Sequence, residues 1–171
     1  IMIRLRETIE VARPIDEVFA YVSNFGNAVQ WDPGVAESRK ASAGPIGVGT
    51  AFKLQVRFGP RSIPMAYAIR EFDRPRRVLL EGKSDSVHAL DDIGFAATPR
   101  GPRITYTADI SLLGAFSVVE PLLKGALDGV GKRAAGRRGD GLQVLEDAHD
   151  LGVDALGHLH GRRVEADLAG K

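Results

Sequence analysis

The chain has 171 residues, of which 44% are hydrophobic and 26% charged, so its composition is that of an ordinary globular protein with a full core. Its 23 Lys and Arg residues nearly balance 22 Asp and Glu residues, and the net charge of +1 gives no reason to expect nucleic acid as a partner. The lack of cysteine excludes disulfides, thiolate nucleophiles and cysteine-bound metals. Because no apolar run is long enough to span a bilayer, we expect no integral membrane association and a cytoplasmic location.

The first part of the chain predicts one strand followed by two short helical segments. Apolar and polar residues alternate between residues 3 and 11, which is typical of a half-buried strand. Pro14 suits the first position of a helix, and the apolar residues after it keep helical spacing to about Phe25. A second short helical turn then leads to the turn signal Trp31-Asp32-Pro33-Gly34.

From residue 35 onward, alternating segments separated by Gly and Pro predict six more strands. The alternation is clearest between residues 52 and 58. The six strands are expected at 35–42, 52–58, 63–69, 78–83, 87–96 and 104–112. Seven strands joined by short connections predict an antiparallel sheet.

The C-terminal part of the chain has a different pattern. After Gly114 the apolar spacing becomes helical and predicts one long helix, which includes Val119, Leu122, Leu123 and Ala126. The glycine-rich segment 136–141 predicts a linker, and the residues after it predict a weakly helical or disordered tail. We therefore expect one ligand-binding domain at residues 1–135 and a separate tail at 136–171.

Several short motifs accompany this order of elements. They are Pro14-x-x-Glu17-Val18-Phe19-x-Tyr21-Val22, Trp31-Asp32, Gly47-Val48-Gly49-Thr50, Asp73-Arg74-Pro75-Arg76-Arg77-Val78 and Thr105-Tyr106-Thr107-Ala108-Asp109. Over about residues 3–135 the chain thereby resembles the START-like (Bet v 1-like, SRPBCC) superfamily, and within it the bacterial polyketide cyclase/dehydrase and lipid-transport type. The resemblance implies an α+β helix-grip fold, in which a seven-stranded antiparallel sheet wraps around the long C-terminal helix and two short helices follow the first strand. It also implies a deep cavity between sheet and helix.

The inward rows of the predicted strands and of the long helix name the residues that would line such a cavity. The alternative is that the same residues fill a solid core, and for Trp31 the alternatives are a place at the cavity mouth and a plug at one end of the core. The expected ligand-binding residues are Trp31, Phe52, Leu54, Val56, Met65, Tyr67, Ile69, Ile93, Phe95, Tyr106, Ala108, Val119, Leu122, Leu123 and Ala126.

Polar residues on these inward rows are the candidates for chemistry, because burying them without a partner is costly. Asp91 is in phase with apolar neighbours, and Tyr67 and Tyr106 carry hydroxyls on inward rows. Asp91 is either a general acid/base or ligand anchor with a pKa raised by burial, or a structural residue at a strand end or bulge. If the protein is an enzyme, we expect Asp91, Tyr67 and Tyr106 to be its catalytic residues.

These observations favour a protein that binds a hydrophobic small molecule, such as a lipid, a polyketide or a similar natural product, for carriage or sequestration. The alternatives are a polyketide aromatase/cyclase that acts on a poly-β-keto chain in the same cavity, and a self-resistance protein that traps a toxic natural product. The four histidines show no metal-ligand spacing, so no metal and no cofactor is expected. We expect a monomer or a weak homodimer.

Overall fold

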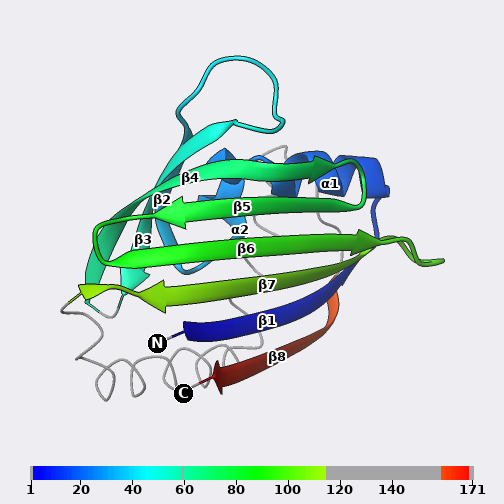
Figure 1. The fold of residues 1–171 in the computed structure, drawn as a ribbon. Coiled ribbons are helices and arrows are strands. Elements are labelled where there is room, and N and C mark those ends of the chain that lie inside the picture. Colours follow the sequence, from blue (N-terminus) through cyan, green and yellow to red (C-terminus); the bar gives the residue numbers. More distant parts are fainter. Residues whose placement is uncertain (1, 59, 115–158, 170–171) are drawn as a thin grey trace.

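The computed structural model describes residues 2–58, 60–114 and 159–169 (Figure 1). The first strand and three short helical segments come at the start of the chain, and seven strands follow. In chain order the elements are β1 (Met2–Val11), α1 (Ile15–Ser23), the 3-10 turn η1 (Phe25–Asn27), α2 (Ala28–Trp31), β2 (Val35–Lys40), β3 (Ala51–Phe58), β4 (Arg61–Asp73), β5 (Arg77–Lys83), β6 (Val87–Ala96), β7 (Arg103–Leu112) and β8 (Leu159–Ala169).

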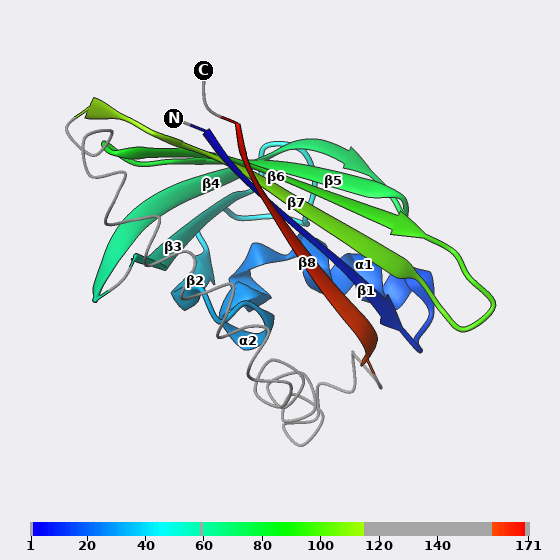
Figure 2. The same cartoon turned by 90° about the horizontal axis from the view of Figure 1, so that it is seen from below.

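The strands form one sheet in the order β2-β3-β4-β5-β6-β7-β1-β8, and every neighbouring pair is antiparallel. The sheet curls around the short helices, which lie on its concave side (Figure 2). The predicted α+β helix-grip class is confirmed. The long helix that would contain Val119, Leu122, Leu123 and Ala126 lies outside the described residues.

Helix α1 packs against one end of the concave face. Its first turn carries Asp16 and Glu17, which suit the positive end of a helix dipole. Val18, Phe19 and Val22 on its apolar side are buried. The ring of Phe19 packs edge-on against Phe72 and Phe95, with ring centroids 5.1 Å apart in both pairs. Such aromatic pairs anchor α1 to the ends of β4 and β6.

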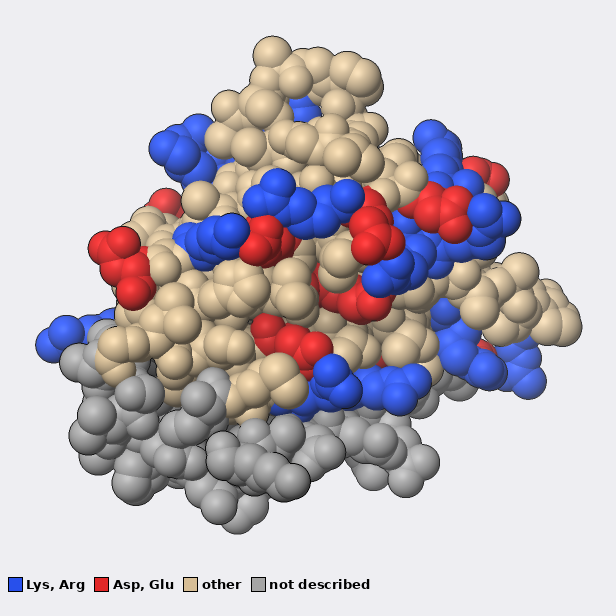
Figure 3. Space-filling model, viewed as in Figure 1, with Lys and Arg blue, Asp and Glu red and all other residues tan. Residues whose placement is uncertain are grey.

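The outer face of the sheet is polar, as the alternation predicts. Cross-strand ion pairs connect its neighbouring strands, including Arg4 with Asp109 at 2.6 Å and Arg103 with Glu10 at 2.6 Å. Figure 3 shows this face, with acidic and basic side chains interspersed over the central strands. Exposed pairs of this kind contribute little stability, so we assign the folding energy to the concave side.

Strand β8 is a correction to the sequence prediction, which expected a weakly helical or disordered tail at 136–171. Residues Leu159–Ala169 instead pair with the whole length of β1, from Met2 opposite Ala169 to Val11 opposite Leu159. The physical reason is that β1 would otherwise be an edge strand with unpaired N–H and C=O groups. The sequence signal is the alternation of Val164, Ala166 and Leu168 with charged residues. The expected boundary at residue 135 lies outside the described residues.

Candidate functional site

The central feature of the concave face is the buried carboxyl group of Asp91, whose residue is 2% exposed. Asp91 lies in the middle of β6, opposite Leu80 of β5 and Ala108 of β7, in a register without irregularity on either side. The structural alternative placed Asp91 at a strand end or bulge, and this placement is wrong. Regular alternation along β6 turns Asp91 inward with Ala89 and Ile93.

Burial raises the pKa of Asp91 from 3.8 to about 7, because a carboxylate is poorly solvated there. Hydrogen bonding from the Tyr106 and Tyr67 hydroxyls lowers this pKa, and the negative charge of Asp32 raises it. Among the described residues the Oδ2 atom of Asp91 has no hydrogen-bond partner. Asp91 therefore changes charge near neutral pH.

The position of Tyr67 depends on the glycine beside it. Tyr67 lies opposite Gly82 in the β4–β5 pair, and Gly82 lies opposite Ala89 in the β5–β6 pair. A Cβ atom built at Gly82 would come within 2.4 Å of Cζ in the Tyr67 ring. The Tyr67 ring thus occupies the space that any side chain at Gly82 would fill, and from there its hydroxyl reaches Asp91 across β5.

Ring contacts connect the two tyrosines that bond to Asp91 with two further aromatic residues. Phe25, from the turn η1, has its ring centroid 5.4 Å from that of Tyr67 and 5.8 Å from that of Trp31. Trp31 in turn packs edge-on against Tyr106 at 6.0 Å. The Nε1 atom of Trp31 is buried and has no hydrogen-bond partner among the described residues. We call Phe25, Trp31, Tyr67 and Tyr106 the aromatic group.

Electrostatics link the two tyrosines to the same carboxyl group. The pKa of the Tyr67 hydroxyl is raised well above its usual value by burial and by the charge of Asp91. Burial and Asp91 raise the pKa of Tyr106 in the same direction. Both tyrosines therefore stay protonated and act as hydrogen-bond donors at physiological pH.

The other expected lining residues on strands also lie on the concave face. Val56 is half-buried and packs against the core, and the remainder are buried: Phe52, Leu54, Met65, Ile69, Ile93, Phe95 and Ala108. Trp31 is half-buried and contacts both Phe25 and Tyr106 within the aromatic group. The expected residues Val119, Leu122, Leu123 and Ala126 lie outside the described residues.

Sequence reasoning missed Phe25 and the role of Gly82. The sequence predicts that a helix ends at about Phe25, whereas Phe25 begins a separate turn that brings its ring over the concave face, against Phe52 and Tyr67. A glycine within the strand pattern was the available signal for Gly82, since such residues often mark a close approach of another group.

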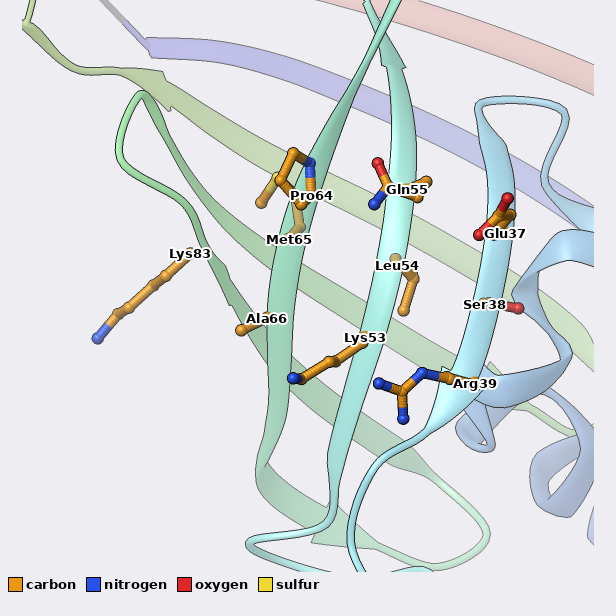
Figure 4. A pocket seen from close by; sticks show the side chains of 10 residues that line it. All are labelled: Glu37, Ser38, Arg39, Lys53, Leu54, Gln55, Pro64, Met65, Ala66 and Lys83. Carbon is orange, nitrogen blue, oxygen red and sulfur yellow. The ribbon is translucent and has the colours of Figure 1, made fainter.

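A groove of about 410 Å³ lies on the opposite, outer face of β2, β3 and β4 (Figure 4). Exposed charged side chains surround it, among them Glu37, Arg39, Lys53 and Lys83. Alternation turns the apolar side chains of Leu54 and Met65 away from it, toward the core. This groove suits polar molecules and is separated from Asp91 by the sheet.

Comparison with known proteins places this fold among proteins of related architecture. The family described as polyketide cyclase/dehydrase and lipid transport matches residues 2–147. The chain belongs to this family. No curated protein sequence matches the chain.

Several solved structures share this fold at low sequence identity. The Zhui aromatase/cyclase from Streptomyces sp. R1128 has a TM-score of 0.65 at 16% identity, over 87% of this chain and 94% of that one. A START superfamily protein from Mycobacterium smegmatis has a TM-score of 0.57 at 16% identity, over 79% and 96%. The di-domain ARO/CYC BexL from the BE-7585A biosynthetic pathway has a TM-score of 0.60 at 13% identity, over 92% of this chain and 50% of its own length.

Membership of the polyketide cyclase/dehydrase and lipid transport family supports a role in binding a hydrophobic ligand or in cyclisation. Within the described ranges, no three His, Asp or Glu side chains come together in a way that could hold a metal ion. None of the described helices has the length and apolar character needed to cross a membrane.

Proposed function

We propose that this protein binds a hydrophobic small molecule on the concave face of the sheet, beside Asp91, in order to carry or sequester it. The observation that carries the proposal is a buried carboxyl group next to the aromatic group, whose Oδ2 atom has no hydrogen-bond partner within residues 2–58, 60–114 and 159–169. Burying such an atom without a partner costs stability, and an apolar residue would serve folding better. A ligand that forms a hydrogen bond with Asp91 would satisfy this oxygen and would explain why a carboxyl group is buried there.

The binding energy would come mainly from apolar contact. The concave face offers aromatic rings and aliphatic side chains, which favour a lipid, a polyketide or a similar natural product. Polar groups are few there, and they would set the orientation of the ligand more than its affinity. The mixed charges of the outer groove fit such a ligand poorly.

Two matched alanine variants test which face binds. Ala108 is buried and lies opposite Asp91, whereas Ala66 is exposed and lines the outer groove. An environment-sensitive fluorescent dye or a long-chain fatty acid should bind the natural protein with a Kd in the micromolar range or tighter. Ala108→Phe should abolish binding and keep the circular dichroism spectrum, and Ala66→Phe should leave binding unchanged.

Two results would contradict the proposal. Loss of binding in Ala66→Phe alone would move the ligand to the outer groove. Absence of binding by a varied apolar set, together with strong destabilisation by Ala108→Phe, would mean that the concave face is a solid core.

A second candidate function is a polyketide aromatase/cyclase acting on a poly-β-keto chain. It is favoured by the pKa of Asp91 at about 7, because an acid/base catalyst works best when its pKa is near the operating pH. Ionised Asp91 would take a proton from a methylene group between two carbonyl groups. The resulting carbanion would form a carbon–carbon bond with a ketone carbon of the same chain, and the proton would return to that ketone's oxygen. Tyr67 and Tyr106 would hold Asp91 in place.

Asp91→Asn separates the two functions. For a cyclase, this variant should lose turnover of a poly-β-keto substrate by about two or more orders of magnitude while still binding apolar ligands. If the protein is a carrier, the poly-β-keto substrate should give the same products with the natural protein, with the variant and without protein. Tyr67→Phe is the matched control, since it keeps the ring and removes one hydroxyl from Asp91.

A further inference from the structure

Two buried polar atoms on the concave face lack partners among the described residues, and they differ in chemistry. The Nε1–H group of Trp31 can only donate a hydrogen bond. The Oδ2 atom of Asp91 accepts a hydrogen bond when the carboxyl group is ionised and can donate one when that oxygen is protonated. Native proteins leave few buried polar atoms unsatisfied, so each such atom needs an explanation.

The two atoms belong to the same site. Trp31 packs edge-on against Tyr106, with ring centroids 6.0 Å apart, and the Tyr106 hydroxyl hydrogen-bonds with Asp91. Phe25 also contacts both Trp31 and Tyr67. The unpartnered donor and the unpartnered carboxyl oxygen therefore border one aromatic surface.

We propose that the site recognises its ligand at two polar points: a hydroxyl group that bonds to Asp91, and a carbonyl or ether oxygen that accepts from the Trp31 indole N–H. The ligand class is thus an apolar, ring-containing molecule that carries both groups. This inference rests on the proposed function and specifies the chemistry of its ligand.

A hydroxyl group is a simple uncharged substituent that can satisfy Asp91 in both of its protonation states. It donates to the carboxylate and accepts from the carboxylic acid. A carbonyl oxygen can bond only to the acid form, and an ammonium group would favour only the carboxylate. At Trp31 the requirement is simpler, because any oxygen acceptor satisfies the indole N–H. A flat ring in the ligand can lie against the surrounding aromatic side chains.

Naphthalene derivatives that differ in one substituent test each point separately. Naphthol is compared with methylnaphthalene, and acetylnaphthalene with ethylnaphthalene, so that neither comparison depends on the spacing of the two points. Binding is measured by calorimetry at about pH 8.5, where Asp91, with its pKa of about 7, is ionised and cannot donate to the acetyl group.

We expect naphthol to bind about tenfold more tightly than methylnaphthalene, and acetylnaphthalene about fivefold more tightly than ethylnaphthalene. Asp91→Leu should abolish the preference for the hydroxyl and keep the preference for the carbonyl. Trp31→Phe, which retains an aromatic ring, should do the reverse. The chain has a single Trp, so the natural protein gives one indole N–H resonance. This resonance should shift downfield with acetylnaphthalene but not with ethylnaphthalene. The measurement needs no variant, so it still tests the proposal if a variant fails to fold.

Equal affinities within each pair, or preferences that persist in both variants, would overturn the two-point proposal while leaving the proposed function in place. Failure of all four naphthalenes to bind would overturn the two-point proposal, and the titration with a dye or a long-chain fatty acid would then test the proposed function separately. A preference for the hydroxyl that depends on Trp31 and not on Asp91 would also contradict the assignment.

Discussion

Tyr67 occupies the space in front of Gly82, so closely that a methyl group at Gly82 would approach Cζ of its ring to 2.4 Å. The two residues are direct partners on β4 and β5, and the hydroxyl of Tyr67 hydrogen-bonds with Asp91 on β6, the next strand. Because Gly82 on β5 has no side chain, the Tyr67 hydroxyl from β4 can reach the Asp91 carboxyl group on β6.

Gly82→Ala should displace the Tyr67 ring and destabilise the protein by about 1–3 kcal/mol, which is typical of overpacking in a core. Loss of the Tyr67 hydrogen bond should also raise the pKa of Asp91, because this bond favours the carboxylate. Chemical denaturation measures the first effect, and NMR titration of the Asp91 carboxyl carbon measures the second.

Gly94→Ala is the matched control, since Gly94 also lies within a strand and a Cβ atom there would meet nothing within 4 Å. We expect this variant to be neutral or slightly stabilising and to leave the pKa of Asp91 unchanged. Equal effects of the two substitutions would show that Gly82 has no special relation to Tyr67.

The raised pKa of Asp91 predicts a specific dependence of stability on pH. Between about pH 4 and pH 7 the folded protein keeps a proton on Asp91 that the unfolded chain has released. The free energy of unfolding should therefore fall as the pH rises through this window, by about 4 kcal/mol from this group, and the effect should level off above pH 7.

Asp91→Asn isolates this contribution, because all other titrating groups remain. The difference in unfolding free energy between the variant and the natural protein should shift in favour of the variant as the pH rises from about 4 to about 7. Denaturant titrations at several pH values give this difference. A difference that is constant with pH would mean that Asp91 has an ordinary pKa in the folded protein.

Pairing of β8 with β1 predicts that the end of the chain contributes to stability. A chain that ends at residue 158 should have a lower melting temperature, and amides of β1 that point toward β8 should exchange faster with solvent. The β1 amides that point toward β7 serve as the internal control. Unchanged melting and exchange would mean that the segment is dispensable, as the glycine-rich linker at 136–141 and the weak helical pattern after it predict.

The inward direction of Asp91, Tyr67 and Tyr106 could be predicted from the sequence, because each lies in a strand with clear period-two alternation. Their contact with one another could not be predicted. It requires the register of four strands, together with the empty space at Gly82, and registers arise from pairing between distant segments.

The position of Phe25 and the strand β8 escaped prediction for a related reason. Phe25 follows helical spacing, and only tertiary packing on Phe52 and Trp31 shows that its ring belongs to the site. The alternation at residues 163–168 is present in the sequence, but its partner is the free edge of β1, at the other end of the chain.

Fluorescence of Trp31 provides the most direct test that an apolar ligand binds within the aromatic group beside Asp91. Trp31 is the single tryptophan of the chain, and its ring contacts Phe25 and Tyr106. Titration with naphthol should change the Trp31 emission in a saturable way, with a midpoint equal to the Kd measured by calorimetry, and Ala108→Phe should abolish the change. Binding that is detected by calorimetry but leaves the Trp31 emission unaltered would contradict this location.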